Sequence, residues 1–230
     1  MAKNPAISHL AIIMDGNRRW AKRHGLPTLE GHRRGYEKIK ALTRWCIECN
    51  IPIVTLYAFS TENWNRSRRE VTYLMSLLRL VLEHDLTELD RQGVRLVVIG
   101  QRERLAPDLQ RLIEKAEATT QRNTRMILQL AISYGGRAEI VQAVRRLIME
   151  RIKAEQVTEA SVGSHLWTAG IPDPDLLVRT AGEQRLSNFL TWQSVYAEIL
   201  FIKKYWPDFT KRDLTAMIRE FGQRQRRFGK

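Results

Sequence analysis

Short apolar runs rich in β-branched residues alternate along this chain with segments of helical periodicity. The runs at 9–14, 53–59, 94–99, 126–132 and 176–178 predict strands, and a weaker run predicts another strand at 198–202. Helical patterns cover 32–49, 69–91, 107–120, 136–153, 158–166 and 210–223. Strands separated by helices predict an α/β fold, with a mostly parallel β-sheet that is flanked by helices and covered on both faces. No repeat or linker divides the sequence, so we expect a single domain over residues 1–230.

Charge and hydropathy limit the classes of protein that fit. The chain has 38 Lys and Arg residues against 25 Asp and Glu residues, a net charge of +13. Such an excess favours phosphate, which could belong to nucleic acid, an anionic lipid surface or a small phosphorylated substrate. The longest apolar run, at 51–59, is too short to span a membrane as a helix and contains Pro52. No secretory signal pattern is present near the N-terminus, so we expect a cytoplasmic protein.

The two cysteines, Cys46 and Cys49, have the C-x-x-C spacing of a redox pair or of half a metal site. Both fall inside a predicted helix, and no second cysteine pair is present to complete a zinc site. We therefore expect ordinary packing, because free cysteine is among the most buried residue types.

Polar residues collect directly after four of the predicted strands, at 15–19, 60–64, 134–137 and 179–183. The carboxyl ends of parallel strands meet at one edge of a sheet, and ligands of open α/β folds bind there. We therefore expect these four segments to share one cleft.

The first segment, Asp15-Gly16-Asn17-Arg18-Arg19, has the composition of a phosphate-binding loop at a helix start. It matches neither of the common glycine-rich nucleotide motifs. Free amides at a helix N-terminus and two guanidinium groups would hold a diphosphate, and Asp15 would be a ligand for a bridging Mg²⁺. The alternative is a surface helix capped by Asp15.

A second constellation suits phosphate in the same way. Arg179 and Arg185 flank 180–184, and Ser187 follows. Arginine binds phosphate with two parallel hydrogen bonds, so two diphosphate-sized sites in one cleft indicate two phosphorylated substrates. The alternative for Arg179 is a solvated loop arginine.

Several ordered motifs resemble the cis-prenyltransferase family, closest to the bacterial undecaprenyl diphosphate synthases. They are HLAIIMDGNRRWA from His9, GH at 31–32, TLYAFSTENWNR, SYGGR, RTAGEQRLSNFLTWQSVYAEI, WPDF and the terminal RRFG. The resemblance implies a parallel-sheet α/β fold, a homodimer, and Mg²⁺-dependent elongation of an allylic diphosphate such as farnesyl diphosphate. Isopentenyl diphosphate would be the unit added, with formation of Z double bonds.

The same resemblance implies roles for individual residues. Asp15, Asn63 and Arg66 match catalytic positions, and Asp15 and Glu198 match metal-binding positions. Substrate-binding positions are matched by Gly16, Asn17, Arg18, Arg19, Trp20, His32, Phe59, Ser60, Trp64, Glu70, Arg179, Arg185, Ser187 and Gly229. Two residues depart from the family pattern. Arg18 replaces a glycine, and Thr28 replaces an arginine that grips the allylic diphosphate in long-chain members.

An elongating isoprenoid needs an apolar wall. The helical pattern from Val71 to Leu82 is apolar nearly all round, which is typical either of a buried core helix or of a tunnel wall. In the strand at 126–132, alternation places Met126, Leu128 and Leu130 on one face, and this set is the expected tunnel floor.

Three other functions remain as alternatives. A Z-specific synthase of short products is permitted by Thr28, and the basic charge permits a nucleic-acid-binding protein, although no nucleic-acid-binding motif is present. A silent regulatory subunit is disfavoured because Asp15, Asn63 and Glu198 are retained. We expect diphosphate substrates, no nucleic acid, and transient contact of the basic surface with an anionic bilayer. Product length is left open by the sequence.

Overall fold

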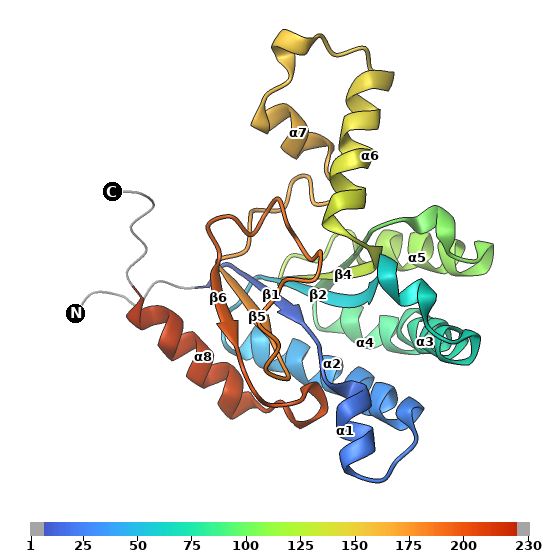
Figure 1. The fold of residues 1–230 in the computed structure, drawn as a ribbon, viewed down its shortest axis with the longest axis vertical. Coiled ribbons are helices and arrows are strands. Elements are labelled where there is room, and N and C mark those ends of the chain that lie inside the picture. Colours follow the sequence, from blue (N-terminus) through green and yellow to red (C-terminus); the bar gives the residue numbers. More distant parts are fainter. Residues whose placement is uncertain (1–6, 225–230) are drawn as a thin grey trace.

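The computed structural model describes residues 7–224 and contains a six-stranded sheet (Figure 1). The strands are β1 (His9–Ile13), β2 (Ile53–Ser60), β3 (Val94–Ile99), β4 (Met126–Tyr134), β5 (Leu176–Arg179) and β6 (Glu198–Phe201). Their order is β3-β4-β2-β1-β5-β6, and each neighbouring pair is parallel. The predicted parallel α/β fold is confirmed, and all six predicted strands are present.

The helices follow the predicted periodicity with differences at their ends. They are α1 (Asn17–Arg23), α2 (Thr28–Glu48), α3 (Arg68–Leu80), α4 (Leu86–Arg91), α5 (Pro107–Thr120), α6 (Gly136–Met149), α7 (Glu159–His165) and α8 (Lys211–Gln223). The helical patterns did not include α1, although a helix start was expected at the Asp15 loop, and α2 begins four residues earlier than predicted. The long helix predicted at 69–91 is divided, because a π-helical turn, Val81–Asp85, separates α3 from α4. Such turns insert one extra residue into a helical turn and occur often at functional sites.

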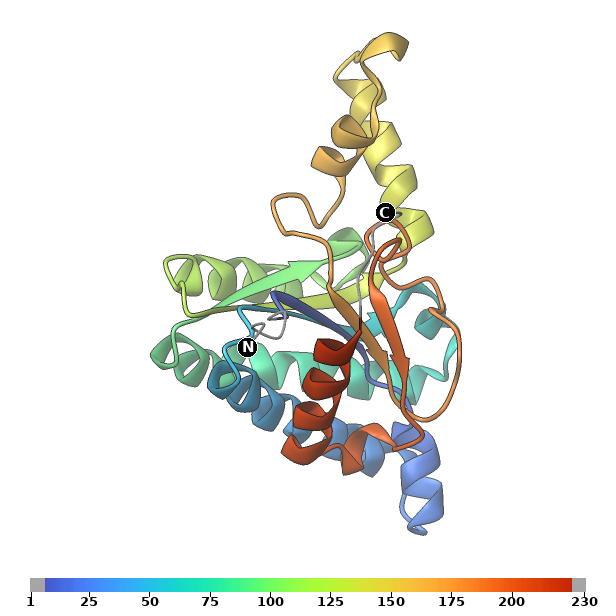
Figure 2. The ribbon, with the colours of Figure 1, turned by 90° about the vertical axis from the view of Figure 1, so that its left-hand side faces the viewer.

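The two faces of the sheet are covered differently. The larger core lies between one face and apolar residues of α2, α3, α5 and α8, including Leu42, Leu78, Ile113 and Phe221. Figure 2 shows α2 and α8 on the same side of the sheet. On the other face a smaller cluster contains Phe189 and residues of the irregular segment 186–199. Both faces of the sheet are thus covered, as predicted, and an irregular segment contributes much of the cover on one of them.

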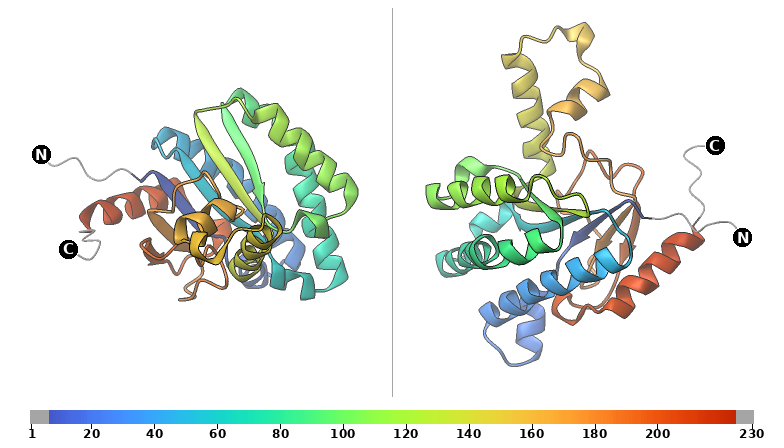
Figure 3. Two further views of the ribbon diagram at one scale, coloured as in Figure 1. Left: turned by 90° about the horizontal axis from the view of Figure 1, so that it is seen from above. Right: turned by 180° about the vertical axis from the view of Figure 1, so that it is seen from behind.

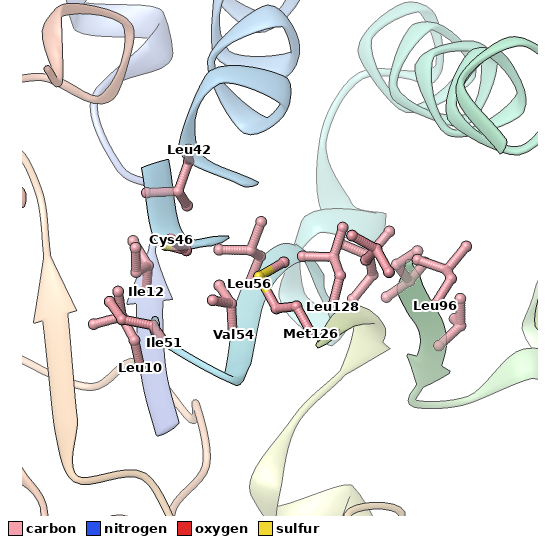
Figure 4. Close-up of a cluster of buried hydrophobic side chains, with 14 of the residues drawn as sticks. Leu10, Ile12, Leu42, Cys46, Ile51, Val54, Leu56, Leu96, Met126 and Leu128 are labelled. Carbon is pink, nitrogen blue, oxygen red and sulfur yellow. The ribbon is translucent and has the colours of Figure 1, made fainter. Parts of the chain in front are cut away.

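The floor expected for the tunnel lies partly inside the larger core. Met126 and Leu128 are buried and point among Val54, Leu56 and Leu96 (Figure 4). Cys46 is in the same core, and burial raises the pKa of its thiol. Cys49 is half-buried, and both thiols are free. The predicted packing role of Cys46 is confirmed.

The free edge of β3 is covered by α5, which lies along it (Figure 3). Thr120 Oγ1 accepts a hydrogen bond from the Leu96 amide at 3.0 Å, and Glu117 Oε1 accepts one from the Val98 amide at 2.8 Å. These side chains satisfy backbone donors that an uncovered edge strand would leave free for another chain. α6 begins just after β4, and α6 and α7 pack together as an arm that projects from the body (Figures 1 and 2).

The strand order places a topological switch point between β1 and β5. These neighbours leave the sheet in opposite directions, because β1 connects toward β2 and β5 connects toward β6. The crevice at the carboxyl ends of two such strands is the usual ligand site of open α/β sheets. Within residues 7–224, no helix is both long enough and apolar enough to span a bilayer.

Candidate active site

Asp15 directly follows β1, and the backbone around it is held tightly. Its carbonyl oxygen accepts hydrogen bonds from Thr180 Oγ1 at 2.6 Å and from the Trp206 amide at 3.0 Å. Gly16 has φ of 103°, and a Cβ there would lie 2.8 Å from the Tyr205 ring. Only glycine combines this left-handed backbone with so little space. The turn therefore delivers the Asp15 side chain to the switch point.

Two glycines of α2 allow the Asp15 loop to pack against this helix. A Cβ on Gly31 would lie 2.1 Å from the carbonyl oxygen of Asn17, and one on Gly35 would lie 2.6 Å from Asn17 Oδ1. The two positions are four residues apart and thus share one helix face. Gly31 of the GH motif is therefore explained by close packing against the Asp15 loop, and His32 by its side-chain chemistry.

A chain of ion pairs crosses the switch point. Arg179 Nη2 donates to Asp15 Oδ2 at 2.9 Å, and Arg19 Nη2 lies 3.1 Å from Asp15 Oδ1. Arg19 Nη1 in turn donates to Glu183 Oε1 at 2.9 Å, and the other Glu183 oxygen is paired with Arg185. Three guanidinium groups, from α1, the end of β5 and the loop after β5, are thus linked by two carboxylates. A diphosphate entering here would compete with these carboxylates for the arginines.

The charges around Asp15 keep it ionised. Burial opposes ionisation, but the hydrogen bond and charge of Arg179, with the charge of Arg19, outweigh it and hold the pKa of Asp15 below its usual value. An ionised carboxylate that opens on a cavity is a suitable oxygen ligand for a hard cation.

Arg179 is buried and closely oriented. Its Nη1 donates to Ser187 Oγ at 2.7 Å and to the carbonyl oxygen of Arg185 at 2.6 Å, while Nε is buried without a partner among the described residues. Burial and three oriented hydrogen bonds exclude the solvated-loop alternative for this arginine.

The segment carrying Ser187 has a strained backbone. Positive φ angles occur at Ala181, Ser187, Asn188 and Leu190, none of which is glycine. Asn188 anchors the segment, because its Oδ1 accepts from the Arg137 amide at 2.9 Å and its Nδ2 donates to Glu62 Oε1 at 3.0 Å. Strain of this kind persists only where the surroundings impose it, and it concentrates at functional sites.

The loop after β2 brings Ser60 and Asn63 to the same edge. Asn63 Oδ1 accepts a hydrogen bond from the Ser60 amide at 3.2 Å, which fixes the amide side chain at the start of a short 3₁₀ turn, Thr61–Asn65. Trp64 donates from Nε1 to Ser133 Oγ at 2.9 Å and packs edge-on against Phe59. The indole therefore anchors the loop against β4.

Glu70 joins two predicted site residues. Its Oε1 lies 3.0 Å from His32 Nε2 and 3.0 Å from Arg66 Nη1, and its side chain is almost fully buried. Burial lowers the pKa of His32, an effect larger than the opposing influence of Glu70. His32 is therefore neutral at pH 7, while Arg66 supplies the positive charge beside the buried carboxylate.

These groups surround one cavity of about 700 Å³, within the usual range for ligand sites. The predicted residues that line it are Asp15, Gly16, Asn17, Arg18, Arg19, His32, Phe59, Ser60, Asn63, Arg66, Arg179 and Ser187. Four other predicted site residues do not line the cavity but lie behind or beside it. Trp64 and Glu70 support lining residues, Arg185 is an exposed partner of Glu183, and Trp20 donates to Asp208 Oδ1 at 2.7 Å. Gly229 lies outside the described residues.

Much of the remaining cavity wall is apolar. It is formed by Ile39 of α2, by Leu74, Met75, Leu77 and Leu78 of α3, by Val81, and by Leu130 and Ile132 of β4. Of the expected floor residues, only Leu130 lines the cavity. Met126 and Leu128 were wrongly assigned, because on their part of β4 the same strand face is covered by core side chains.

Sequence reasoning missed several residues of the cavity, including Tyr36 and Tyr57. Tyr36 lies one helical turn after His32, so the spacing of α2 contained a signal for it. Tyr57 had no such signal. Its hydroxyl donates to the carbonyl oxygens of Tyr134 and Ser187, contacts that depend on the tertiary fold. Thr28 is the first residue of α2 and does not line the cavity.

Glu198 is not placed with Asp15 in this chain. It begins β6 and pairs in register with Leu176 at the amino end of β5, whereas Asp15 follows the carboxyl end of β1. Its carboxylate accepts a hydrogen bond from Arg224 Nη1 at 2.7 Å. Within a single chain the two predicted metal ligands therefore lie at opposite edges of the sheet.

The residues near Asp15 fit a magnesium ion that is bound jointly by the protein and by a diphosphate. No three His, Cys, Asp or Glu side chains converge as a metal centre within residues 7–224. Asp15 offers a single carboxylate beside arginines suited to phosphate. Mg²⁺ at phosphate sites is typically bound by one or two carboxylates together with substrate phosphates and water. The site thus fits a cation shared with a diphosphate.

Comparison with known proteins gave consistent matches. A family profile described as putative undecaprenyl diphosphate synthase matches residues 13–229. The chain is 47% identical to an isoprenyl transferase of Agrobacterium fabrum, over 96% of this chain and 91% of the relative. It is also 47% identical to an isoprenyl transferase of Bacillus cereus, over 96% of this chain and 87% of the relative.

Two solved structures share the fold. A lavandulyl diphosphate synthase of Lavandula x intermedia, solved with dimethylallyl diphosphate, superposes with a TM-score of 0.94 at 38% identity, covering 98% of this chain and 99% of that one. A probable undecaprenyl diphosphate synthase of Campylobacter jejuni superposes with a TM-score of 0.83 at 36% identity, covering 98% and 100%.

Proposed function

The chain belongs to the undecaprenyl diphosphate synthase family of prenyltransferases, and from that premise we propose that it is a Mg²⁺-dependent cis-prenyltransferase. Its substrates are an allylic diphosphate, such as farnesyl diphosphate, and isopentenyl diphosphate. It joins them with formation of Z double bonds and gives a polyprenyl diphosphate of the undecaprenyl type, which would serve as a lipid carrier in cell-wall synthesis.

The observation that carries this proposal is the ion-pair chain at the switch point. Arg19 of α1 and Arg179 at the end of β5 approach the two oxygens of Asp15, and Arg185 lies beyond Glu183. We assign the Asp15–Arg19 side to the allylic diphosphate and the Arg179–Arg185–Ser187 side to isopentenyl diphosphate. Both diphosphates would then lie at the polar end of a cavity whose remaining wall is largely apolar.

For this reaction the protein must place the two substrates and stabilise the charge on the leaving diphosphate. A nucleophilic side chain is not required. The C–O bond of the allylic diphosphate breaks, and the diphosphate leaves with the electron pair. The alkene of isopentenyl diphosphate forms the new C–C bond to the allylic carbon, and loss of a proton restores a double bond. Arg19 and the amides at the start of α1 stabilise the charge on the leaving group.

Asp15 would hold the magnesium ion together with diphosphate oxygens. When bound, the ion supplies further neutralisation of the departing diphosphate. Arg179, being buried and hydrogen-bonded to Ser187, keeps the isopentenyl diphosphate in one orientation. The strained segment held by Asn188 preserves that orientation between turnovers.

Asn63, His32 and Arg66 also line the cavity. We assign Asn63 and Arg66 to alkene positioning and proton loss, with a diphosphate oxygen as the proton acceptor. His32 is neutral and contacts Glu70, so it adds no positive charge that would repel a carbocation-like allylic carbon.

A short product is the second candidate. The fold superposes on a lavandulyl diphosphate synthase with a TM-score of 0.94, against 0.83 for a probable undecaprenyl diphosphate synthase. Leu74, Met75, Leu77 and Leu78 of α3, with Val81 after it, nonetheless line the cavity with apolar side chains, which favours the longer product.

We propose a homodimer, with the projecting arm as part of its interface. Val141, Val144 and Ile148 follow helical spacing on one face of α6 and are 51%, 44% and 69% exposed, and Met149 beside them is 70% exposed. Apolar side chains gathered in this way mark association sites, and a second copy of the chain presents the same face.

We assign the protein to the cytoplasm, with transient contact between its basic surface and an anionic bilayer. The alternatives are less favoured. Arg19, Arg66 and Arg179 of the cavity are already paired with carboxylates, which suits a small anion that competes for them more than a nucleic-acid backbone. A catalytically silent regulatory subunit would not require an ionised Asp15 at the switch point.

Release of inorganic diphosphate tests this function. We expect release only when isopentenyl diphosphate, an allylic diphosphate and Mg²⁺ are all present, with one diphosphate released for each condensation. Chelation by EDTA should abolish the release, and added Mg²⁺ should restore it. Equal release from the allylic diphosphate alone would indicate a diphosphatase and contradict the proposal.

A further inference from the structure

Tyr36 connects α2 to the π-helical turn on the far side of the cavity. Its ring lines the cavity, and its hydroxyl donates a hydrogen bond to Asp85 Oδ2. Lys40 Nζ pairs with Asp85 Oδ1 at 2.5 Å and lies 5.0 Å from the centroid of the Tyr36 ring. We call these three residues the Asp85 tie.

The Asp85 tie has a counterpart at the other end of α3. Near the start of α3, Glu70 contacts His32 of α2 at 3.0 Å. Asp85 closes the π-helical turn that follows α3. The helical stretch is therefore attached to α2 at both ends, and the residues between the two attachments, Leu74–Val81, supply much of the apolar cavity wall.

The burial and the partners of Asp85 favour stable contacts within the Asp85 tie. The Asp85 side chain is only 16% exposed and receives one neutral and one charged donor. Burial, together with Asp85, raises the pKa of Tyr36 to about 12, so its hydroxyl remains a donor at every physiological pH. A partly buried charge with two partners is costly to release, because either partner would be left unsatisfied.

We propose that Tyr36 and its hydrogen bond to Asp85 limit the length of the product. The inference rests on the proposed function, since it requires an isoprenoid chain growing along the apolar wall. The growing chain meets the Tyr36 ring, and the Asp85 tie prevents the ring and the π-helical turn from separating to admit further units. The residue pair thereby sets the point at which elongation stops.

The test compares the chain lengths of products from four variants. Tyr36→Phe removes only the hydroxyl, Asp85→Asn removes the charge, and Tyr36→Ala removes the ring. Asp108→Asn is the matched control, because Asp108 pairs with Arg79 of α3 at 2.6 Å but lies outside the cavity. Each protein receives labelled isopentenyl diphosphate and farnesyl diphosphate, and dephosphorylated products are separated by chromatography.

We expect Tyr36→Phe and Asp85→Asn to lengthen the main product by at least one isoprene unit, and Tyr36→Ala to lengthen it further. Asp108→Asn should keep the native distribution. If Asp85→Asn fails to fold, Tyr36→Phe still decides the question, since it leaves the ring and both charges in place. The inference would be overturned if Tyr36→Phe and Tyr36→Ala gave the same product lengths as the native protein, or if Asp108→Asn gave an equal shift. The proposed function would still stand in either case. Absence of any labelled product from the native protein would overturn the proposed function as well.

Discussion

Arg179 Nη2 and Asp15 Oδ2 lie 2.9 Å apart, which joins the carboxyl ends of β5 and β1 at the switch point of the sheet. The pair is the meeting point of the two proposed diphosphate sites. Because Asp15 also contacts Arg19, a change at this carboxylate affects guanidinium groups from both loops.

Asp15→Asn keeps the shape of the side chain and removes its charge. We expect kcat to fall by roughly two to three orders of magnitude, as for the loss of one group that stabilises developing charge. The fold should remain intact, because the backbone of Asp15 keeps its hydrogen bonds to Thr180 and Trp206. Steady-state kinetics and a thermal unfolding curve check both parts. Activity near the native level with Mg²⁺ would remove Asp15 from the mechanism.

Arg185→Ala removes an exposed guanidinium whose partner in the unliganded protein is Glu183. Loss of a charge-assisted contact to the substrate costs about 1.5–3 kcal/mol, so KM for isopentenyl diphosphate should rise about 10- to 100-fold. Arg179→Ala should raise this KM too and, because Arg179 also contacts Asp15, should lower kcat. Arg91→Ala, which breaks an exposed pair with Glu88 on α4, is the control. An equal rise in KM for the allylic substrate would show that the two sites are wrongly divided.

Much of the site could be predicted because its residues follow strand ends or occupy recognisable motifs. Asp15, Asn63 and Arg179 fall at the carboxyl edge of a parallel sheet, so strand prediction alone brings them together. The Tyr36–Asp85 contact could not be found in this way. It joins residues 49 positions apart, and the π-helical turn that presents Asp85 has no clear sequence signal.

Strand alternation has a similar limit. It correctly grouped Leu128 and Leu130 on one face, but it cannot tell which part of that face meets a cavity and which meets packed side chains. For Glu198, only the register of β6 against β5 reveals that the residue begins its strand at the amino edge.

Stability should decrease as the pH falls below about 6.5, because His9 and His32 are buried. Burial lowers the pKa of both imidazoles from their usual value of 6.5. Below that value the unfolded chain binds protons that the folded protein does not, so the free energy of unfolding falls with decreasing pH. Asp15 does not contribute in this range, since its lowered pKa places its protonation below 3.8.

Urea unfolding at a series of pH values measures this dependence. His9→Gln should flatten the curve between pH 7.5 and 5, because glutamine cannot gain the proton. An unchanged slope in this variant would mean that His9 does not contribute to the acid destabilisation.

Deletion of residues 226–230 tests the terminal RRFG motif, for which we propose a contact with the isopentenyl diphosphate of the partner subunit. The deletion retains Arg224 and its ion pairs with Glu198 and Glu220. We expect a folded dimer by sedimentation, with strongly reduced turnover and weaker use of isopentenyl diphosphate. Full activity of the shortened chain would exclude the segment from the active site.

The most direct measurement is transfer of label from isopentenyl diphosphate into an apolar product. The native protein is incubated with farnesyl diphosphate, labelled isopentenyl diphosphate and Mg²⁺, and the butanol-extractable label is counted and separated by chain length. The proposed function predicts label in polyprenyl diphosphates extended by several units, and none when the allylic diphosphate is omitted. Label that stays entirely in isopentenyl diphosphate, whichever allylic diphosphate is supplied, would contradict it.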